Sequence, residues 1–292
     1  MSIVKGALYV VATPLGNLGD ITHRAVKILA EVDLVAAEDT RRSKRLLQHL
    51  GVTTACMALH EHNESQMVPR ILARLEAGQT VALVSDAGTP LISDPGFELV
   101  RRLRERDFPV IPIPGPSAVI AALSVAGLPC ERFAFEGFLP ARAAARQRRL
   151  EALRMECRTL VFYEAPHRIQ ATLADMKQIL GDQREAVIAR ELTKTFETVR
   201  HDTLGSLLSW VTGDANQRRG EFVIMVGGRV QPREAGEASI SHEHLLTVLL
   251  ASHSLKQAVS LAAAISGAGR NRLYELAIRL NEKRLDRDPE KR

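Results

Sequence analysis

Short, mainly apolar runs alternate with amphipathic stretches along residues 1–113. Apolar runs at residues 7–12, 33–37, 80–85 and 110–113 predict buried strands. The stretches between them repeat the order strand, loop, helix, which favours a mostly parallel sheet covered by helices on both faces. The first part of the chain is therefore expected to be an α/β domain.

Two acidic residues mark expected helix starts in this part of the chain. Asp20 is predicted to cap a helix whose apolar face lies within residues 21–29. Asp94 precedes Pro95, and an N-cap followed by proline at the first helical position predicts another helix. A strongly basic helix is expected over residues 41–50.

Residues 112–116, Pro-Ile-Pro-Gly-Pro, cannot continue a strand or a helix and are expected to form a hinge. A helix over residues 117–126 ends at Gly127, and a second α/β set follows. Its strands are expected at residues 133–138, 159–163, 185–189 and 221–226, with amphipathic helices between them. The predicted domains are therefore residues 1–113 and residues 114–228.

The remaining chain predicts a linker and a small helical domain. Glycine, proline and charge without periodicity indicate the linker at residues 227–239. The helical domain is expected at residues 240–286, with helices over residues 242–251, 255–265 and 270–280. Two helices joined by a short glycine-containing turn resemble a helix-turn-helix.

Composition limits the class of protein. Hydrophobic residues make up 46% and charged residues 25%, which is typical of a globular protein, and the 4% of aromatics leaves the core to aliphatic side chains. The formal charge of +5 permits an anionic partner without requiring one. Three cysteines without a C-x-x-C pair, no signal-peptide pattern and no run of membrane-spanning length favour a soluble cytoplasmic protein. His60 and His62 have same-face strand spacing, but no third ligand is evident in the sequence, so no metal is expected.

Two loops rich in glycine and proline follow predicted strands, at the positions where α/β sheets bind ligands. Residues 13–20 match neither a Walker A loop nor G-x-G-x-x-G, so a plain tight turn is the alternative there. Residues 85–96 hold two glycines, two prolines and two aspartates, so that loop is rigid and its backbone can approach a ligand closely. Asp86 is expected to serve the ligand, whereas Asp94 is explained as the helix cap.

Three further segments carry candidate chemistry. Residues 114–118 would begin a helix that a ligand can approach closely, or would be a plain hinge. Glu164 and Arg168 suit acid–base or phosphate chemistry, unless Glu164 only stabilises a helix N-terminus. Residues 190–194 would alternate between two faces of a strand, for which a salt-bridged strand edge is the alternative.

Basic residues gather in three groups, which together favour an RNA partner because phosphate contacts come largely from arginine and lysine. Each group could also be a solvated helix face. The groups are Arg41, Arg42, Lys44 and Arg45; Arg142, Arg146, Arg148, Arg149, Arg154 and Arg158; and Arg270, Arg272 and Arg279.

Seven motifs occur in a fixed order: VATPLGNLGDIT, AAEDTRRSKRLL, VALVSDAGTPLISDPG, IPIPGPSA, FEGFLP, FYEAPHRI and RELTK. As a set over about residues 6–228 they resemble the ribosomal RNA small-subunit cytidine-2′-O-methyltransferase branch of the tetrapyrrole methylase superfamily. The resemblance implies two α/β domains with S-adenosylmethionine in the cleft between them, a small C-terminal helical domain, and a homodimer. It also implies 2′-O-methylation of a cytidine in the decoding region of 16S ribosomal RNA, within the small subunit.

The resemblance further implies site residues. The methyl donor would be bound by Pro14, Asp86, Ala87, Gly88, Thr89, Pro90, Ile92, Ser117, Ala118, Tyr163 and Leu192, and residues 14–19 would line the substrate side. A ribose hydroxyl is a poor nucleophile, so a base should accept its proton; the unranked candidates are Glu38, Asp39, Asp86 and Glu164. RNA would contact Arg41, Arg42, Arg146, Arg148, Arg149, Arg168, Lys194, Arg270 and Arg272.

Two alternatives stay open. The first is a tetrapyrrole C-methyltransferase of the same superfamily, which the basic groups and the helical tail disfavour. The second is a non-catalytic RNA-binding assembly factor, which the density of glycine–proline loops at strand ends disfavours.

Overall fold

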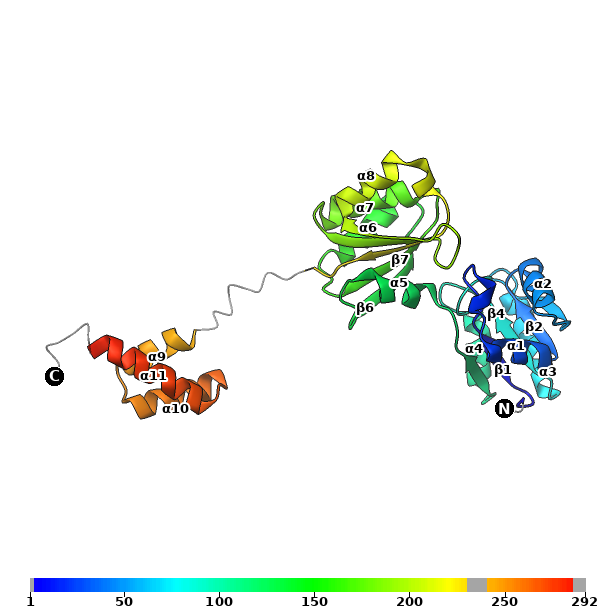
Figure 1. The fold of residues 1–292 in the computed structure, drawn as a ribbon. Coiled ribbons are helices and arrows are strands. Elements are labelled where there is room, and N and C mark those ends of the chain that lie inside the picture. Colours follow the sequence, from blue (N-terminus) through cyan, green and yellow to red (C-terminus); the bar gives the residue numbers. More distant parts are fainter. Residues whose placement is uncertain (1–2, 230–240, 286–292) are drawn as a thin grey trace. The chain divides into compact units, whose positions relative to one another are not determined.

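The computed structural model describes residues 3–229 and 241–285, and the chain divides into two compact units, residues 1–229 and residues 230–292 (Figure 1). Each unit is described by itself. Residues 230–239 of the predicted linker, and residues 240 and 286 of the predicted helical domain, lie outside the described residues.

The first sheet of the larger unit is parallel throughout, as the sequence predicts. Its strands are β1 (Leu8–Val11), β2 (Leu34–Ala37), β3 (Cys56–Ala58), β4 (Val81–Val84) and β5 (Val110–Ile113), in the order β3-β2-β4-β1-β5. Strand β3 is not predicted from the sequence, because its three residues are short and only half-buried.

Helices cover both faces of this sheet. They are α1 (His23–Glu31), α2 (Thr40–His49), α3 (Glu64–Glu76) and α4 (Phe97–Arg104). Leu29 of α1 and Leu47 of α2 share one buried cluster with the sheet. Ile71 of α3 and Leu99 of α4 share another, which contains Leu8 of β1. Burial on both faces explains why these strands read as continuous apolar runs.

The predicted cap at Asp20 is wrong. Asp20 ends a short 3-10 helix, η1 (Leu18–Asp20), so α1 begins later. Its N-cap is Thr22, whose hydroxyl oxygen accepts the N–H of Ala25 at 3.1 Å. The 3-10 turn, which Asn17 caps, takes up the aspartate that the sequence pattern assigned to the N-cap.

The second sheet of the larger unit is mixed. Its strands are β6 (Phe133–Phe138), β7 (Thr159–Glu164), β8 (Glu185–Arg190), β9 (Thr198–Thr203) and β10 (Phe222–Val226), in the order β6-β7-β10-β8-β9. Only β6 and β7 pair in parallel, and β10 runs antiparallel to both of its neighbours. The opposite direction of β10 brings the start of that strand to the edge where β7 and β8 end.

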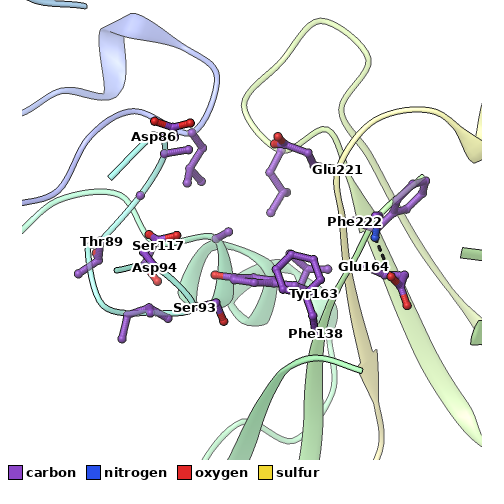
Figure 2. Close-up of a pocket in the computed structure, with 18 of the residues that line it drawn as sticks. Asp86, Thr89, Ser93, Asp94, Ser117, Phe138, Tyr163, Glu164, Glu221 and Phe222 are labelled. Atoms are coloured by element: carbon purple, nitrogen blue, oxygen red, sulfur yellow. Dashed lines mark hydrogen bonds between the residues drawn. The ribbon is translucent and has the colours of Figure 1, made fainter. Parts of the chain in front are cut away.

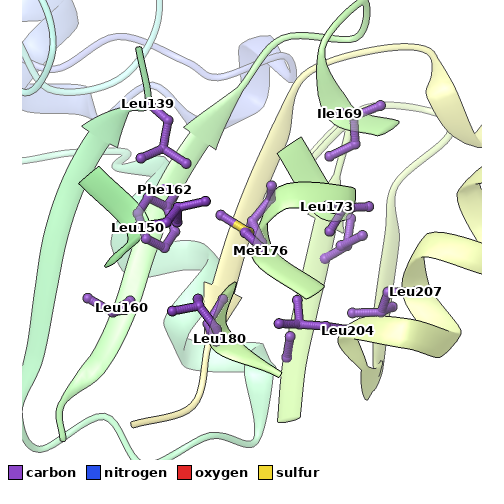
Figure 3. Packing of buried hydrophobic residues seen from close by; sticks show 14 of the residues in the cluster. Leu139, Leu150, Leu160, Phe162, Ile169, Leu173, Met176, Leu180, Leu204 and Leu207 are labelled. Atoms are coloured by element: carbon purple, nitrogen blue, oxygen red, sulfur yellow. The ribbon is translucent and has the colours of Figure 1, made fainter. Parts of the chain in front are cut away.

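Helices cover this sheet on both faces as well. They are α5 (Ala118–Ala126), α6 (Ala143–Leu153), α7 (Ile169–Leu180) and α8 (Leu204–Gly213), with a 3-10 helix η2 (Ala215–Arg218) after them. Phe162 of β7 packs in one cluster with Met176 of α7 and Leu207 of α8 (Figure 3). Val119 of α5 packs on the other face. Strand β5 belongs to the first sheet and α5 to the second, so we retain the boundary at residues 113/114 as a proposal.

Residues 190–194 do not form the predicted continuous strand. Strand β8 ends at Arg190, and Glu191 and Thr193 adopt left-handed φ angles of 52° and 67°. A carboxylate oxygen of Glu197 accepts the N–H of Thr193 at 2.6 Å, so side-chain contacts replace the ladder here.

The second unit is a three-helix cluster, which confirms the predicted helices. They are α9 (His242–Leu250), α10 (Leu255–Ser266) and α11 (Arg270–Leu285), packed around Leu246, Ala258 and Leu273. Ser254 and Gln257 form a capping box at the start of α10. Gly267 ends α10 in the left-handed conformation that favours glycine. Across residues 3–229 and 241–285, no helix combines the length and the apolar character needed to cross a membrane.

Candidate functional site

A cleft of about 450 Å³ lies between the two sheets of the larger unit (Figure 2). One side is formed by segments that follow β1, β2 and β4, and the other by the ends of β6 and β7 and the start of β10. The start of α5 completes the lining. Carboxyl ends of parallel strands are where α/β sheets bind ligands, and the volume falls within the range of about 300–1,000 Å³ typical of small-molecule pockets.

One wall of the cleft is apolar and aromatic. The rings of Tyr163 and Phe138 lie 5.5 Å apart between centroids, and Leu192, Ala118 and Val223 extend the wall. Burial raises the pKa of Tyr163 to about 12, with a contribution from the charge of Asp94. The tyrosine is therefore a neutral hydroxyl at physiological pH.

The opposite wall is acidic. Asp86 accepts the N–H of Asp39 at 3.0 Å and pairs with Arg42 at 3.2 Å, while Glu38 accepts the N–H of Asp86 at 3.4 Å. Burial raises the pKa of Glu38. Burial also raises the pKa of Asp94 to about 6, and the charges of Glu38 and Asp86 add to the effect against an opposing hydrogen bond from Ser85.

The loop over residues 85–96 is held in a strained shape. Gly88, Leu91, Ser93 and Gly96 all have left-handed φ angles, of 83°, 73°, 69° and 120°. Gly88 also exchanges two backbone hydrogen bonds with Thr13, at 2.9 and 3.0 Å. A Cβ atom on Gly88 would lie 3.2 Å from a methyl group of the neighbouring loop, so glycine permits this close backbone approach.

Most predicted donor-binding residues line the cleft together. These are Asp86, Ala87, Gly88, Thr89, Ile92, Ser117, Ala118, Tyr163 and Leu192, joined by Glu38, Arg42 and Glu164 from the other predicted sets. Pro14 and Pro90 are not among the lining residues; both are buried next to lining residues in the chain.

Two of the four candidate bases have other roles in the structure. Asp39 caps α2 by accepting the N–H of Arg41 at 2.8 Å, and it does not line the cleft. Hydrogen bonds from Arg41 lower the pKa of Asp39. Glu164 has a fully buried side chain that pairs with Arg168 at 3.2 Å and accepts a hydrogen bond from Thr172. Asp39 thus lies outside the cleft and Glu164 is already paired, so neither gains support as the base, and the identity of the base stays a prediction.

The predicted RNA-contacting residues divide by exposure. The prediction for Arg146 is wrong, because its side chain is 6% exposed and pairs with Asp175 at 2.6 Å inside the second sheet's core. Arg168 is also tied down, by Glu164 and the carbonyl oxygen of Leu139. Lys194 bridges Glu191 and Glu221 at 2.9 Å each. The exposed members are Arg41, Arg42, Arg148, Arg149, Arg270 and Arg272.

Leu15 lines the cleft, as expected for residues 14–19, but sequence reasoning misses several other lining residues: Ser93, Phe138, Ala165, Pro166, Ala189, Glu221, Phe222 and Val223. Phe138 lies inside a recognisable motif, which could have flagged it. Residues 221–223 begin β10, and only the antiparallel direction of that strand brings them to the cleft. Asp94 was noticed but assigned to a helix cap.

The paired histidines show no metal geometry. The rings of His60 and His62 meet edge to face with centroids 6.1 Å apart. Within the ranges that the structure describes, no group of three or more histidine, cysteine or acidic side chains is arranged to hold a metal ion.

Solved structures share the fold of the larger unit. A uroporphyrin-III C-methyltransferase from Thermus thermophilus aligns with a TM-score of 0.55 at 21% identity, covering 76% of this chain and 94% of that one. A diphthine synthase aligns with a TM-score of 0.60 at 17% identity, covering 76% and 90%. A Thermus thermophilus uroporphyrin-III C-methyl transferase complexed with S-adenyl homocysteine aligns at 0.52 and 18% identity, covering 76% and 97%.

Sequence comparisons are closer. The family of tetrapyrrole (corrin/porphyrin) methylases matches residues 7–208, and the RsmI C-terminal HTH domain matches residues 235–281. Proteins named ribosomal RNA small subunit methyltransferase I are 56% identical over 275 residues in Pseudomonas aeruginosa (94% of this chain, 97% of the relative) and 46% identical over 283 residues in Haemophilus influenzae (97% and 100%). The chain belongs to the tetrapyrrole methylase family, in the branch formed by these ribosomal RNA small subunit methyltransferases.

Proposed function

We propose that this protein transfers a methyl group from S-adenosylmethionine to the 2′-oxygen of a cytidine in the decoding region of 16S ribosomal RNA. The observation that carries the proposal is the two-sided cleft, in which an aromatic wall faces an acidic wall. Membership in the methylase family and the names of the relatives support the reaction and the RNA class.

The cleft fits the methyl donor in size and charge. An adenosine suits a wall of aromatic and aliphatic side chains, and the donor's positively charged sulfonium and ammonium groups suit the carboxylates of Glu38 and Asp86. When bound, the donor supplies a methyl group that is already activated by the sulfonium. The protein's part is to align the acceptor oxygen, exclude water and remove a proton.

Residues 87–90 and the start of α5 at Ser117 and Ala118 are proposed to hold the donor's methionine part. Tyr163 and Leu192 are proposed to flank its adenosine. Both assignments are supported by the convergence of these residues on one cleft. The Ser117 hydroxyl makes no capping hydrogen bond with the first N–H groups of α5.

Exposed arginines are proposed to contact the RNA backbone. Arg42 lies on the cleft lining with 64% of its side chain exposed, and Arg41 next to it is 86% exposed. The acidic wall would repel phosphates, so the RNA backbone would stay outside the cleft. A nucleotide would then have to be unstacked to bring its ribose hydroxyl to the cleft. Arg270 and Arg272 on α11 are proposed to add contacts from the helical domain.

The substrate is proposed to be the small ribosomal subunit in the cytoplasm, and the protein is proposed to act as a homodimer. Ile120 and Val125 of α5 are 57% and 54% exposed, which supplies apolar surface suited to burial in such a dimer. Sedimentation of the purified protein would test the dimer.

A labelled-methyl transfer assay tests the proposed function. Protein and labelled S-adenosylmethionine are incubated with unmodified small subunits, and the RNA is digested to nucleosides for mass spectrometry. Label in 2′-O-methylcytidine is the expected result. A parallel reaction with a tetrapyrrole acceptor tests the C-methyltransferase alternative, and RNA binding without label would indicate an assembly factor. A control variant, Lys27→Gln, changes an exposed side chain on α1 and should give the same label as the wild-type protein.

A further inference from the structure

The loop before α4 places Asp94 in the cleft instead of at the N-cap of the helix. An Asp-Pro pair before a helix normally supplies the capping carboxylate. Here α4 begins at Phe97, and its N-cap is Gly96, which offers no side-chain hydrogen bond to the helix. The carboxylate of Asp94 lies among the cleft-lining groups instead (Figure 2).

The backbone of this loop is strained. Leu91 and Ser93, on either side of Ile92, have φ angles of 73° and 69°, which non-glycine residues rarely adopt. Such outliers persist where the surrounding structure requires them, and they concentrate at functional positions. Ser93 also lies against Gly137 of β6, where a Cβ atom would come within 3.1 Å of its hydroxyl, so the loop is fitted to the second sheet.

Three of the five carboxylates that line the cleft have cationic partners. Glu164 is paired with Arg168, Asp86 with Arg42, and Glu221 with Lys194. Each of these three side chains is therefore already held by a cation in the structure.

Glu38 and Asp94 remain, and their surroundings differ. Glu38 accepts a backbone N–H and lies within the electrostatic influence of Arg42. Asp94 accepts a hydrogen bond from Ser85, and among the described residues the charged groups that act on it are the carboxylates of Glu38 and Asp86. It is therefore the cleft carboxylate whose surroundings most favour taking up a proton.

We infer that Asp94 is the catalytic residue that accepts the proton of the ribose 2′-hydroxyl during methyl transfer, an inference that rests on the proposed function. The hydroxyl oxygen forms a bond to the methyl carbon as the bond from that carbon to sulfur breaks. The sulfur keeps the bonding electron pair and becomes a neutral thioether. The hydroxyl proton moves to the Asp94 carboxylate and is later released to water.

The electrostatics of the site agree with this role. A general base works best with a pKa near the operating pH. Burial raises the pKa of Asp94 to about 6, and Glu38 and Asp86 add to the effect, while the hydrogen bond from Ser85 opposes it. The neutral phenol of Tyr163 also faces it. Asp94 would thus be ionised at neutral pH and more basic than an ordinary aspartate.

The test combines rate and binding measurements on the full chain. Single-turnover methyl transfer to small subunits at saturating donor is measured from pH 5 to pH 9, and S-adenosylhomocysteine affinity is measured by calorimetry. Asp94→Asn is expected to lower the rate by about 100-fold or more, within the range for loss of a general base, and to change affinity by less than about threefold. The acidic limb of the wild-type rate, centred near the Asp94 pKa of about 6, should be absent from the variant.

Two further variants keep the test decisive. Asp94→Glu keeps a carboxylate and should recover part of the rate with a shifted pH profile. Asp107→Asn makes the same change at an exposed position just after α4 and should leave the rate unchanged. An Asp94→Asn protein with the wild-type rate, or one that loses only S-adenosylhomocysteine affinity, would overturn the inference while the proposed function stands. If wild-type protein places no label in RNA, the proposed function fails, and this inference with it.

Discussion

Asp94→Asn is expected to make the folded protein more stable at pH 8. In the folded state the pKa of Asp94 rises from its ordinary value of 3.8 to about 6, chiefly because the carboxyl is buried. Between about pH 4 and pH 6 the folded protein therefore binds more protons than the unfolded chain, so the free energy of unfolding falls as pH rises through that window. The asparagine removes the charge and with it this loss.

The size of the effect follows from the shift. About two pKa units correspond to roughly 3 kcal/mol at 1.36 kcal/mol per unit. Asp94 is only partly buried, so solvent screening reduces this to about 1–2 kcal/mol. The gain should be close to its full value at pH 8 and only about a third of that at pH 4.5, where the wild-type carboxyl is mostly protonated in the folded state.

Urea unfolding of wild type and Asp94→Asn at pH 4.5 and pH 8 measures the difference, since the other carboxylates contribute equally to both proteins. Asp107→Asn serves as the control and should show no pH-dependent difference from wild type. An Asp94→Asn protein that is no more stable than wild type at pH 8 would refute the reasoning, because the charge would then carry no burial penalty. A stabilised but inactive variant would show that the buried charge of Asp94 costs stability and serves function.

Three other perturbations follow from the described contacts. Gly96→Ala should lower the free energy of urea unfolding by about 2 kcal/mol or more, because its Cβ atom would lie 2.7 Å from a leucine methyl group of β4 at a φ of 120°. Gly78→Ala, at φ 78° with open space around it, should lower it by only about 1 kcal/mol. Equal losses would show that the contact with the leucine is irrelevant. Asp175→Asn should lower the unfolding free energy by about 3 kcal/mol by leaving the buried guanidinium of α6 without its partner, while donor affinity of the folded protein is retained; a loss below about 1 kcal/mol would mean the pair is dispensable. Exchanging both Arg270 and Arg272 for glutamate should weaken RNA binding and reduce its salt dependence. The affinity for S-adenosylhomocysteine, measured by calorimetry, should not change. Unchanged RNA affinity would remove the helical domain from the proposed interface.

The sequence by itself determined four of the five strands of the first sheet and the position of the main loops. Parallel strands buried on both faces must be apolar along their whole length, so β1, β2 and β4 are visible as runs. Glycine and proline after a strand restrict the backbone locally, and for that reason the loop at residues 85–96 could be identified as part of the cleft. The three helices of the C-terminal unit were equally local, since capping residues and apolar spacing lie close together in the chain.

Only the tertiary structure decided which polar groups are free. Arg146 belongs to a basic stretch that reads as a surface, yet its partner Asp175 is 29 residues away and buries it. Residues 221–223 reach the cleft only because β10 runs antiparallel to its neighbours, a pairing between distant segments. Asp94 carries a valid local capping pattern that the path of its loop overrides. Local patterns fix which conformations a segment favours, but long-range packing and pairing determine where its side chains finally lie.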